Sequence, residues 1–290
     1  MGGAAHRAPA PQPAPAAPTA PASGSEERPW EASELLVGAG PGGALPPAAV
    51  ERAAEAFLRH GICVLQDAVE PELVQRCAAC AAQSLEGCRA RLQELGIDME
   101  NQPFSFREVV HRSRGRFDMQ LLPGAACAPV DEPTLEDEAP WLPLLRRLLG
   151  HDARRLFTGA VVSSPGAEAQ EAHMDGFHLF GQEEAEGAIQ CPPHCLTIFV
   201  PLIDVNMQNG PTEFWPGTHH LSKEFNGSAP SFAPELTVGS AVLFDYRLIH
   251  RGLPNCSGAR RPVLYMVWAR SWFNDCINFP PQSLFPDGAA

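Results

Sequence analysis

The sequence predicts a mainly β protein, with helices in its first half and a barrel or sandwich of short strands in its second half. Helical periodicity dominates before residue 150, and β-rich runs separated by Pro/Gly turns dominate after it. Composition agrees, because 30 Pro, 25 Gly and only two Tyr in 290 residues favour many turns and short elements. The length suits one large domain with a buried core.

The predicted organisation is a tail, a domain and a second tail. Residues 1–45 are rich in Pro and Ala and are expected to be disordered, because they offer few large apolar side chains to bury. The folded domain is expected over residues 46–278. Residues 279–290 are expected to be a C-terminal tail.

The helices are expected near the start of the domain. Ala48–His60 carries apolar residues on one helical face, and Gly61 marks its end. A short buried strand, Ile62–Leu65, follows. Pro71 opens a helix expected to end near Gly96, and a shorter helix is expected from Pro140 to Leu149.

The predicted strands are apolar runs rich in β-branched and aromatic residues. Turn sequences such as Asn209-Gly210-Pro211 separate them. The runs are Leu156–Ser163, Cys195–Pro201, Val238–Phe244 and Val263–Trp268.

Charge and cysteine content exclude several classes of protein. The net charge of −13, from 34 acidic and 21 basic residues, disfavours binding to nucleic acid or to an anionic membrane surface. The sequence has no apolar run long enough to span a membrane. Nine Cys without framework spacing predict reduced thiols in a cytoplasmic protein, with organelle targeting by the N-terminal tail left open. Oligomeric state cannot be read from the sequence.

The strongest chemical signal is the sequence His173-Met174-Asp175. In a strand, residues two apart project to the same face, so both side chains can reach one point. His250 follows 77 residues later. Two imidazoles and one carboxylate form the facial triad of non-haem Fe(II) oxygenases, and the lack of thiolate ligands argues against structural zinc.

Two arginines follow the distal histidine. Arg260 and Arg261 directly precede the run Pro262–Trp268, so one of them can point into the barrel and hold a carboxylate through its planar guanidinium. Neighbours in a strand face opposite ways, so at most one does so. The residues alone leave open which of the two arginines points inward.

From about Pro47 to Asn274, the chain resembles the phytanoyl-CoA dioxygenase family of Fe(II)/2-oxoglutarate oxygenases. The resemblance rests on HMDGFHLF, on NGPTEFWPGTHH (Asn209–His220), on HRGLPNCSGARR and on the opening GICVLQDAVEPELV. It implies a double-stranded β-helix (jelly-roll) with flanking N-terminal helices.

The same resemblance implies roles for individual residues. His173, Asp175 and His250 would bind Fe(II), with 2-oxoglutarate and O2 as cosubstrates and Arg261 on the distal carboxylate of 2-oxoglutarate. Thr212 and Gln120 would also line the cosubstrate site. Some members of the family have a serine two residues after the distal histidine, and this chain has Gly252 at that position. One polar contact to 2-oxoglutarate is therefore missing here or is supplied by another residue.

The function expected from these residues is hydroxylation or desaturation of a small organic metabolite, with succinate and CO2 as coproducts. The alternatives are an acyl-CoA 2-hydroxylase, a non-oxidative metal-binding cupin and a non-catalytic binding protein. A coenzyme A substrate would favour a basic patch that the sequence lacks, and Arg261 has a clear role only with a dicarboxylic cosubstrate. A halogenase is disfavoured because Asp175 fills the position that chloride would need.

Other reactive residues have simpler interpretations. His178 is mainly interpreted as structural, and so are His219 and His220. Cys77-Ala-Ala-Cys80 lies on a predicted helix, far from any βαβ pattern, so no redox role is expected for it. Cys191-Pro-Pro-His194-Cys195 lacks a fourth zinc ligand, and the acidic run Gln182–Glu186 is expected to be a solvated loop, with a lid as the alternative.

Overall fold

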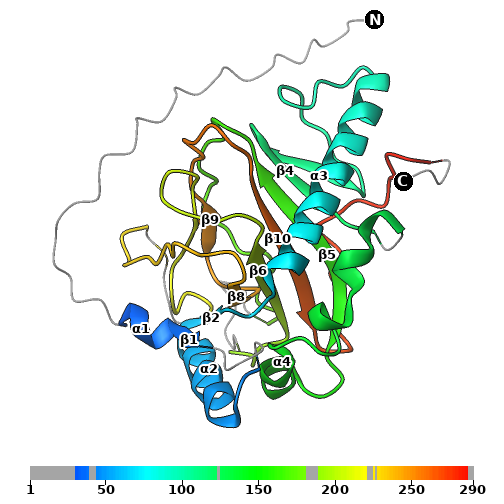
Figure 1. The fold of residues 1–290 in the computed structure, drawn as a ribbon. Coiled ribbons are helices and arrows are strands. Elements are labelled where there is room, and N and C mark those ends of the chain that lie inside the picture. The colour runs from blue at the N-terminus through cyan, green and yellow to red at the C-terminus, as the bar shows by residue number, and fades with distance from the viewer. Residues whose placement is uncertain are drawn as a thin grey trace, which may run out of the picture.

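A large mixed sheet, with helices on one face and a small second sheet on the other, forms the fold (Figure 1). The structure is a computed structural model that describes residues 30–38, 44–122, 125–180, 189–220, 225 and 227–286. The large sheet has eight strands in the order β1-β2-β8-β6-β10-β5-β4-β3, and the second sheet pairs β7 with β9. This pair of facing sheets is the expected double-stranded β-helix.

The helical elements lie mainly in the first half of the chain. They are α1 (Ala32–Leu35), α2 (Pro47–His60), α3 (Pro71–Glu94), the 3-10 helices η2 (Ala125–Asp131) and η3 (Pro133–Leu135), and α4 (Leu142–Leu149). The strands are β1 (Leu36–Gly38), β2 (Ile62–Gln66), β3 (Val109–Ser113), β4 (Arg116–Gln120), β5 (Arg154–Ser163), β6 (Cys195–Pro201), β7 (Thr212–Phe214), β8 (Ala241–Asp245), β9 (His250–Gly252) and β10 (Arg261–Ala269).

The predicted helix boundaries are confirmed where the sequence carries start and stop residues. Pro47 and Pro71 each occupy the first turn of their helix, where the missing N–H costs no hydrogen bond. Gly61 ends α2 with a left-handed φ of 77°, and its N–H donates to Phe57 O at 2.7 Å. No helix in the described part of the chain is long and apolar enough to cross a bilayer.

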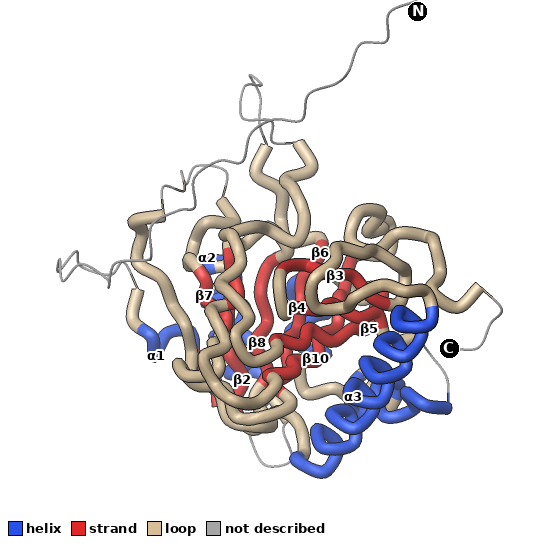
Figure 2. Tube along the Cα trace, turned by 90° about the horizontal axis from the view of Figure 1, so that it is seen from above, coloured by secondary structure: helices blue, strands red, loops and turns tan. Residues whose placement is uncertain are grey.

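The large sheet has two chemically different faces. Along β10, Leu264, Met266 and Trp268 pack into the main hydrophobic core, which also contains buried residues of α2, α3 and α4. The alternate residues Tyr265 and Val267 face a cavity between the two sheets. Figure 2 shows α3 running along the outside of the large sheet. The helices therefore support the sheet from outside, and the interior face is left for chemistry.

Both expected tails contain ordered segments, which corrects the predicted domain limits. Trp30, Leu35 and Val37 are buried, and β1 pairs in parallel with β2. At the other end Leu284 is 1% exposed, and its N–H donates to the Glu108 carboxylate at 2.7 Å. In both segments a few large apolar side chains find a place in the core, although the surrounding sequence is rich in Pro and Gly. Of the two expected tails, residues 1–29, 39–43 and 287–290 lie outside the described residues.

Candidate metal centre and cavity

Three possible metal ligands from distant parts of the chain meet at one point. His173 and Asp175 lie in the segment that follows β5, and His250 is the first residue of β9. One ligand atom from each side chain lies within 4.8 Å of the other two. Two imidazoles and one carboxylate grouped in this way can hold one face of a six-coordinate metal and leave the other positions open.

A backbone bridge brings the two histidines together. His173 N donates to His250 O at 3.0 Å, and His250 N donates to His173 O at 2.9 Å. Residues that exchange both bonds lie directly opposite each other, and the ring centroids are 4.6 Å apart. The strand expected at HMD is reduced to this single bridge. After Asp175 the chain passes Tyr246 so closely that a Cβ at Gly176 would lie 2.4 Å from the Tyr246 ring.

The two imidazole rings are oriented by backbone carbonyl groups. His173 Nδ1 lies 2.8 Å from Glu171 O, and His250 Nδ1 lies 2.9 Å from Leu248 O. When Nδ1–H donates to these carbonyls, Nε2 of each ring carries the lone pair that binds a metal. Burial lowers the pKa of His250, which favours the neutral imidazole that a metal requires.

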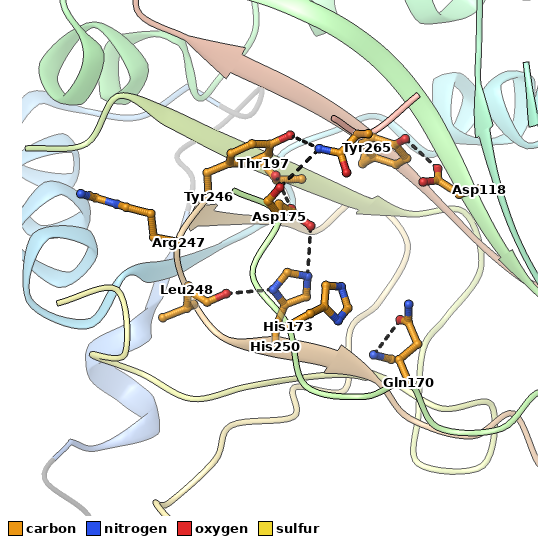
Figure 3. Close-up of polar contacts among 12 residues, drawn as sticks. Asp118, Gln170, His173, Asp175, Thr197, Tyr246, Arg247, Leu248, His250 and Tyr265 are labelled. Carbon is orange, nitrogen blue, oxygen red and sulfur yellow. Dashed lines mark hydrogen bonds and ion pairs between the residues drawn. The ribbon is translucent and has the colours of Figure 1, made fainter. Parts of the chain in front are cut away.

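The Asp175 carboxylate is fixed from two sides (Figure 3). Its Oδ2 accepts a hydrogen bond of 2.9 Å from Thr197 on β6, and its Oδ1 lies 3.5 Å from His250 Nε2. Asn278 Nδ2 donates to Asp175 O at 3.3 Å and to the Tyr246 hydroxyl at 2.7 Å. The segment expected to end the domain at residue 278 therefore contributes directly to the site.

A second part of the cavity is strongly cationic. Arg261 begins β10, Arg116 begins β4, and both donate to the Ser163 hydroxyl on the strand between them, at 2.8 Å and 2.6 Å. Arg261 is 2% exposed and Arg116 is 1% exposed. Among the described residues no carboxylate forms an ion pair with either guanidinium, and each Nε lacks a hydrogen-bond partner.

The two buried guanidinium groups destabilise each other's charge. Burial, followed by the charge of Arg116, lowers the pKa of Arg261 to about 9, and burial lowers the pKa of Arg116 to about 10. A buried charge is costly unless it is paired. This corner of the cavity therefore fits an anion, and the planar guanidinium groups suit a carboxylate.

Strand alternation separates the two neighbouring arginines. Arg261 lines the cavity, whereas Arg260 lies on the other face and pairs with Glu86 of α3 at 2.7 Å. The structure thus places Arg261 inward, as the family resemblance implies.

Gly252 leaves the space that Arg116 occupies. A Cβ at Gly252 would lie 2.4 Å from Arg116 Nη1 and 2.7 Å from Gln170 Oε1. Where relatives place a serine, this chain has no side chain, and the Arg116 guanidinium lies beside that position. The polar group that the serine supplies in those relatives is therefore replaced here by the guanidinium group of Arg116 from β4.

The three possible metal ligands and the arginine pair line one cavity of about 510 Å³. Thr212 also lines it, as predicted from the resemblance, but Gln120 does not. Gln120 lies at the end of β4, while Arg116 and Asp118, at two-residue spacing on the same strand, contribute side chains to the wall.

A buried network forms another wall of the cavity. Asp118 accepts hydrogen bonds from the Tyr265 hydroxyl at 2.7 Å and from Arg112 Nε at 2.9 Å. Burial raises the pKa of Asp118, and the adjacent Arg112 opposes that rise. The Arg112 guanidinium lies 5.6 Å from the ring centroid of Phe279. Since each carboxylate oxygen has a donor, this network shapes the wall and is not a vacant anion site.

The sequence analysis missed four residues that act at the site: Arg116, Asp118, Thr197 and Asn278. The two on β4 had a usable signal, because RFDMQ carries two charged residues at strand spacing within an otherwise apolar run. Thr197 and Asn278 belong to no recognisable motif in the sequence, and only the fold brings them into contact with Asp175.

The remaining sequence candidates lie elsewhere or have structural roles. The described residues contain one cluster that could hold a metal, the His173–Asp175–His250 triad, so Cys191, His194 and Cys195 do not form a second. His219 is buried against Gly61, and burial lowers its pKa to about 4. His178 does not line the cavity. The acidic run 182–186 lies outside the described residues.

The fold and the site define an Fe(II)- and 2-oxoglutarate-dependent enzyme: the triad has the donor set that Fe(II) prefers, and the unpaired arginines fit a dicarboxylate. The phytanoyl-CoA dioxygenase family model matches residues 57–263, and the chain belongs to that family.

Solved structures share this fold at low sequence identity. AviO1 from Streptomyces viridochromogenes Tue57 is similar with a TM-score of 0.56 and 18% identity, covering 80% of this chain and 99% of that chain. The non-heme alpha-ketoglutarate-dependent epimerase SnoN of nogalamycin biosynthesis has a TM-score of 0.52 and 17% identity, covering 82% of this chain and 96% of its own. The carbocyclase SnoK has a TM-score of 0.51 and 19% identity, with coverage of 78% and 85%.

Proposed function

We propose that the protein hydroxylates or desaturates a small organic molecule, with 2-oxoglutarate converted to succinate and CO2. The observation that carries the proposal is the pair of buried, unpaired arginines in the same cavity as the His173–Asp175–His250 triad. A non-oxidative cupin or a simple metal-binding protein would not need a preformed site that binds a carboxylate next to its metal.

Two groups of residues would bind the metal and the cosubstrate. His173, Asp175 and His250 would hold Fe(II) and would leave positions open for 2-oxoglutarate to bind. Arg261 and Arg116 would bind the distal carboxylate, and Ser163 fixes both guanidinium groups before the ligand arrives. When bound, the iron supplies the activation of O2 and the oxidising power of the reaction.

The protein's own work is positioning and the exclusion of water. Thr197 and Asn278 hold the ligand Asp175 in one orientation, so the metal geometry is set before substrate binds. The cavity wall near the network of Asp118 is largely aromatic and aliphatic, including Phe157, Tyr265 and Val267. Such a wall favours a substrate with an apolar body placed so that one C–H bond faces the metal.

The cavity size favours a small substrate over a coenzyme A thioester. About 510 Å³ must hold both the cosubstrate and the reacting part of the substrate. SnoN and SnoK are an epimerase and a carbocyclase, so ring closure and epimerisation are outcomes to look for in the product as well as hydroxylation.

The test is 2-oxoglutarate turnover with product analysis. We expect the purified protein with Fe(II), ascorbate and O2 to release succinate, at a rate that rises when a panel of small metabolites includes a substrate. Labelled O2 then separates the outcomes: one labelled atom in the product indicates hydroxylation, and loss of two hydrogens indicates desaturation or ring closure. His250→Ala is the matched control. No succinate above that control, from protein shown to bind both iron and 2-oxoglutarate, would refute the proposal.

A further inference from the structure

Two buried cysteines lie next to each other on the outer side of the large sheet. In the sequence they are distant from the residues of the candidate metal centre. Cys80 lies in the middle of α3, and Cys127 lies in η2, which packs against that helix. Their sulfur atoms are 2.6 Å apart, about 0.5 Å more than the length of a disulfide bond. Cys80 is 3% exposed and Cys127 is 5% exposed.

No redox role is expected from the sequence of Cys77-Ala-Ala-Cys80. The sulfur that the fold places beside Cys80 belongs to Cys127, on another element. The short distance between the two sulfur atoms means that little movement is needed for a bond to form between them. Cys77 is buried one turn earlier on the same helix and has a similar environment, so it provides an internal comparison.

The two thiols are not equivalent. The Cys80 thiol donates to Cys127, and this hydrogen bond, more than any other factor, lowers the pKa of Cys127. The Ser84 hydroxyl lies 3.4 Å from the same sulfur and lowers that pKa further. The same contact raises the pKa of Cys80. Cys127 has two neighbouring hydroxyl or thiol groups, Ser84 and Cys80, that can stabilise a negative charge on its sulfur, so we assign it as the nucleophile of the pair.

We propose that Cys80 and Cys127 form a reversible disulfide that links α3 to η2, with a peroxide as oxidant and a dithiol as reductant. The Cys127 thiolate attacks one oxygen of hydrogen peroxide, the O–O bond breaks, and a sulfenic acid forms as hydroxide leaves and takes up the thiolate's former proton as water. The Cys80 sulfur then attacks the sulfenic sulfur, the S–O bond breaks, and a second water leaves. The balance is two thiols and one peroxide giving one disulfide and two waters. A dithiol returns the pair to thiols and becomes a disulfide itself.

The link would act on the side of the molecule that supports the cavity. α3 carries Glu86, which pairs with Arg260, the neighbour of the cavity residue Arg261. A cross-link between residues 80 and 127 closes a long loop, which restricts the unfolded chain more than the folded one. The expected effect is a more stable oxidised protein. This inference does not depend on the proposed reaction.

Peptide mapping of the wild-type chain tests the link directly. The full-length protein is treated with hydrogen peroxide at low molar excess, blocked with an alkylating agent and digested with trypsin. We expect a linked pair made of the peptide 77–89, which holds Cys77, Cys80 and Cys88, and the peptide that holds Cys127. Fragmentation must place the link on Cys80. Dithiothreitol should remove it, and the oxidised protein should melt roughly 5–15 °C higher than the reduced protein.

Variants separate this pair from its neighbours. Cys127→Ser and Cys80→Ser should each abolish the link and the peroxide-dependent rise in Tm, while Cys77→Ser should keep both. The wild-type map stands even if a variant fails to fold. Attachment of Cys127 to Cys77 or Cys88, over-oxidation of Cys127 without a linked peptide, or recovery of all nine free thiols would overturn the proposal.

Discussion

The arginine pair gives the sharpest test of how the cavity binds its cosubstrate. Arg261→Ala removes one of two guanidinium groups from a corner where no carboxylate of the described residues forms an ion pair with them. A lost charge-assisted contact in a buried site costs roughly 2–4 kcal/mol, a factor of about 30 to 1,000 in affinity. Because Arg116 still donates to Ser163 and faces the same corner, we expect the lower end of that range for the single variant. The double variant with Arg116→Ala should approach the upper end.

The adjacent Arg260 is a matched control for this experiment. Its side chain is 41% exposed and pairs with Glu86 on the surface, so Arg260→Ala should change the KM for 2-oxoglutarate by less than about twofold. The assay is succinate release against 2-oxoglutarate concentration, with direct calorimetric titration of 2-oxoglutarate and a thermal melt as fold control. Equal sensitivity at the two positions, or greater sensitivity at Arg260, would refute the assignment of Arg261.

Four further predictions follow from the same structure. His250→Ala should lose stoichiometric Fe(II), measured by metal analysis, and turnover; retention of both would show that the triad is misassigned. Thr197→Val should weaken iron binding or activity by about 10- to 100-fold because Asp175 loses its hydrogen bond, whereas Thr158→Val, a buried control on β5, should not. With excess chloride, mass spectrometry should find no chlorinated product, because the carboxylate ligand fills that position; chlorination by the wild type would contradict this reading. Deleting residues 1–29 should leave Tm unchanged, but deleting 1–45 should lower it by roughly 5–15 °C because buried side chains are lost; equal melting of the two truncated chains would refute this.

The sequence predicted the elements whose ends are marked by particular residues, such as proline at a helix start or glycine at a helix end. Within a helix, a proline such as Pro71 is tolerated only in the first turn, and Gly61 ends a helix at little cost, so α2 and α3 were predicted within a few residues. The runs at β5, β6 and β10 were found because they are apolar, β-branched and longer than a turn.

The missed elements depend on contacts distant in sequence. β1 has three residues and lies in Pro/Gly-rich surroundings, so it is a strand only because β2 offers a partner. The C-terminal segment is similar, since Glu108 fixes Leu284 across a separation of 176 residues. Local propensity carries no information about such pairings.

The part of the candidate site that was predictable consists of residues at recognisable intervals in the sequence. The candidate ligands His173, Asp175 and His250 follow from intervals along the chain. Strand alternation allows only one of Arg260 and Arg261 to point inward, and the family resemblance indicates Arg261. Arg116 could not be predicted in this way, because its partner Ser163 lies on a neighbouring strand and its space is left by a glycine on a third.

The short strand β1 has a consequence for solubility as well as for stability. In the sheet order β1 lies outermost, next to β2, whose first four residues, Ile62 to Leu65, are all buried. Without β1 the backbone N–H and C=O groups along that side of β2 would be open to pairing with another chain, and the segment is apolar, β-prone and free of proline. A three-residue strand offers too little backbone to recruit a partner itself. The N-terminal segment thus covers the edge of β2, and a chain trimmed to residue 46 should aggregate more on concentration than the full chain.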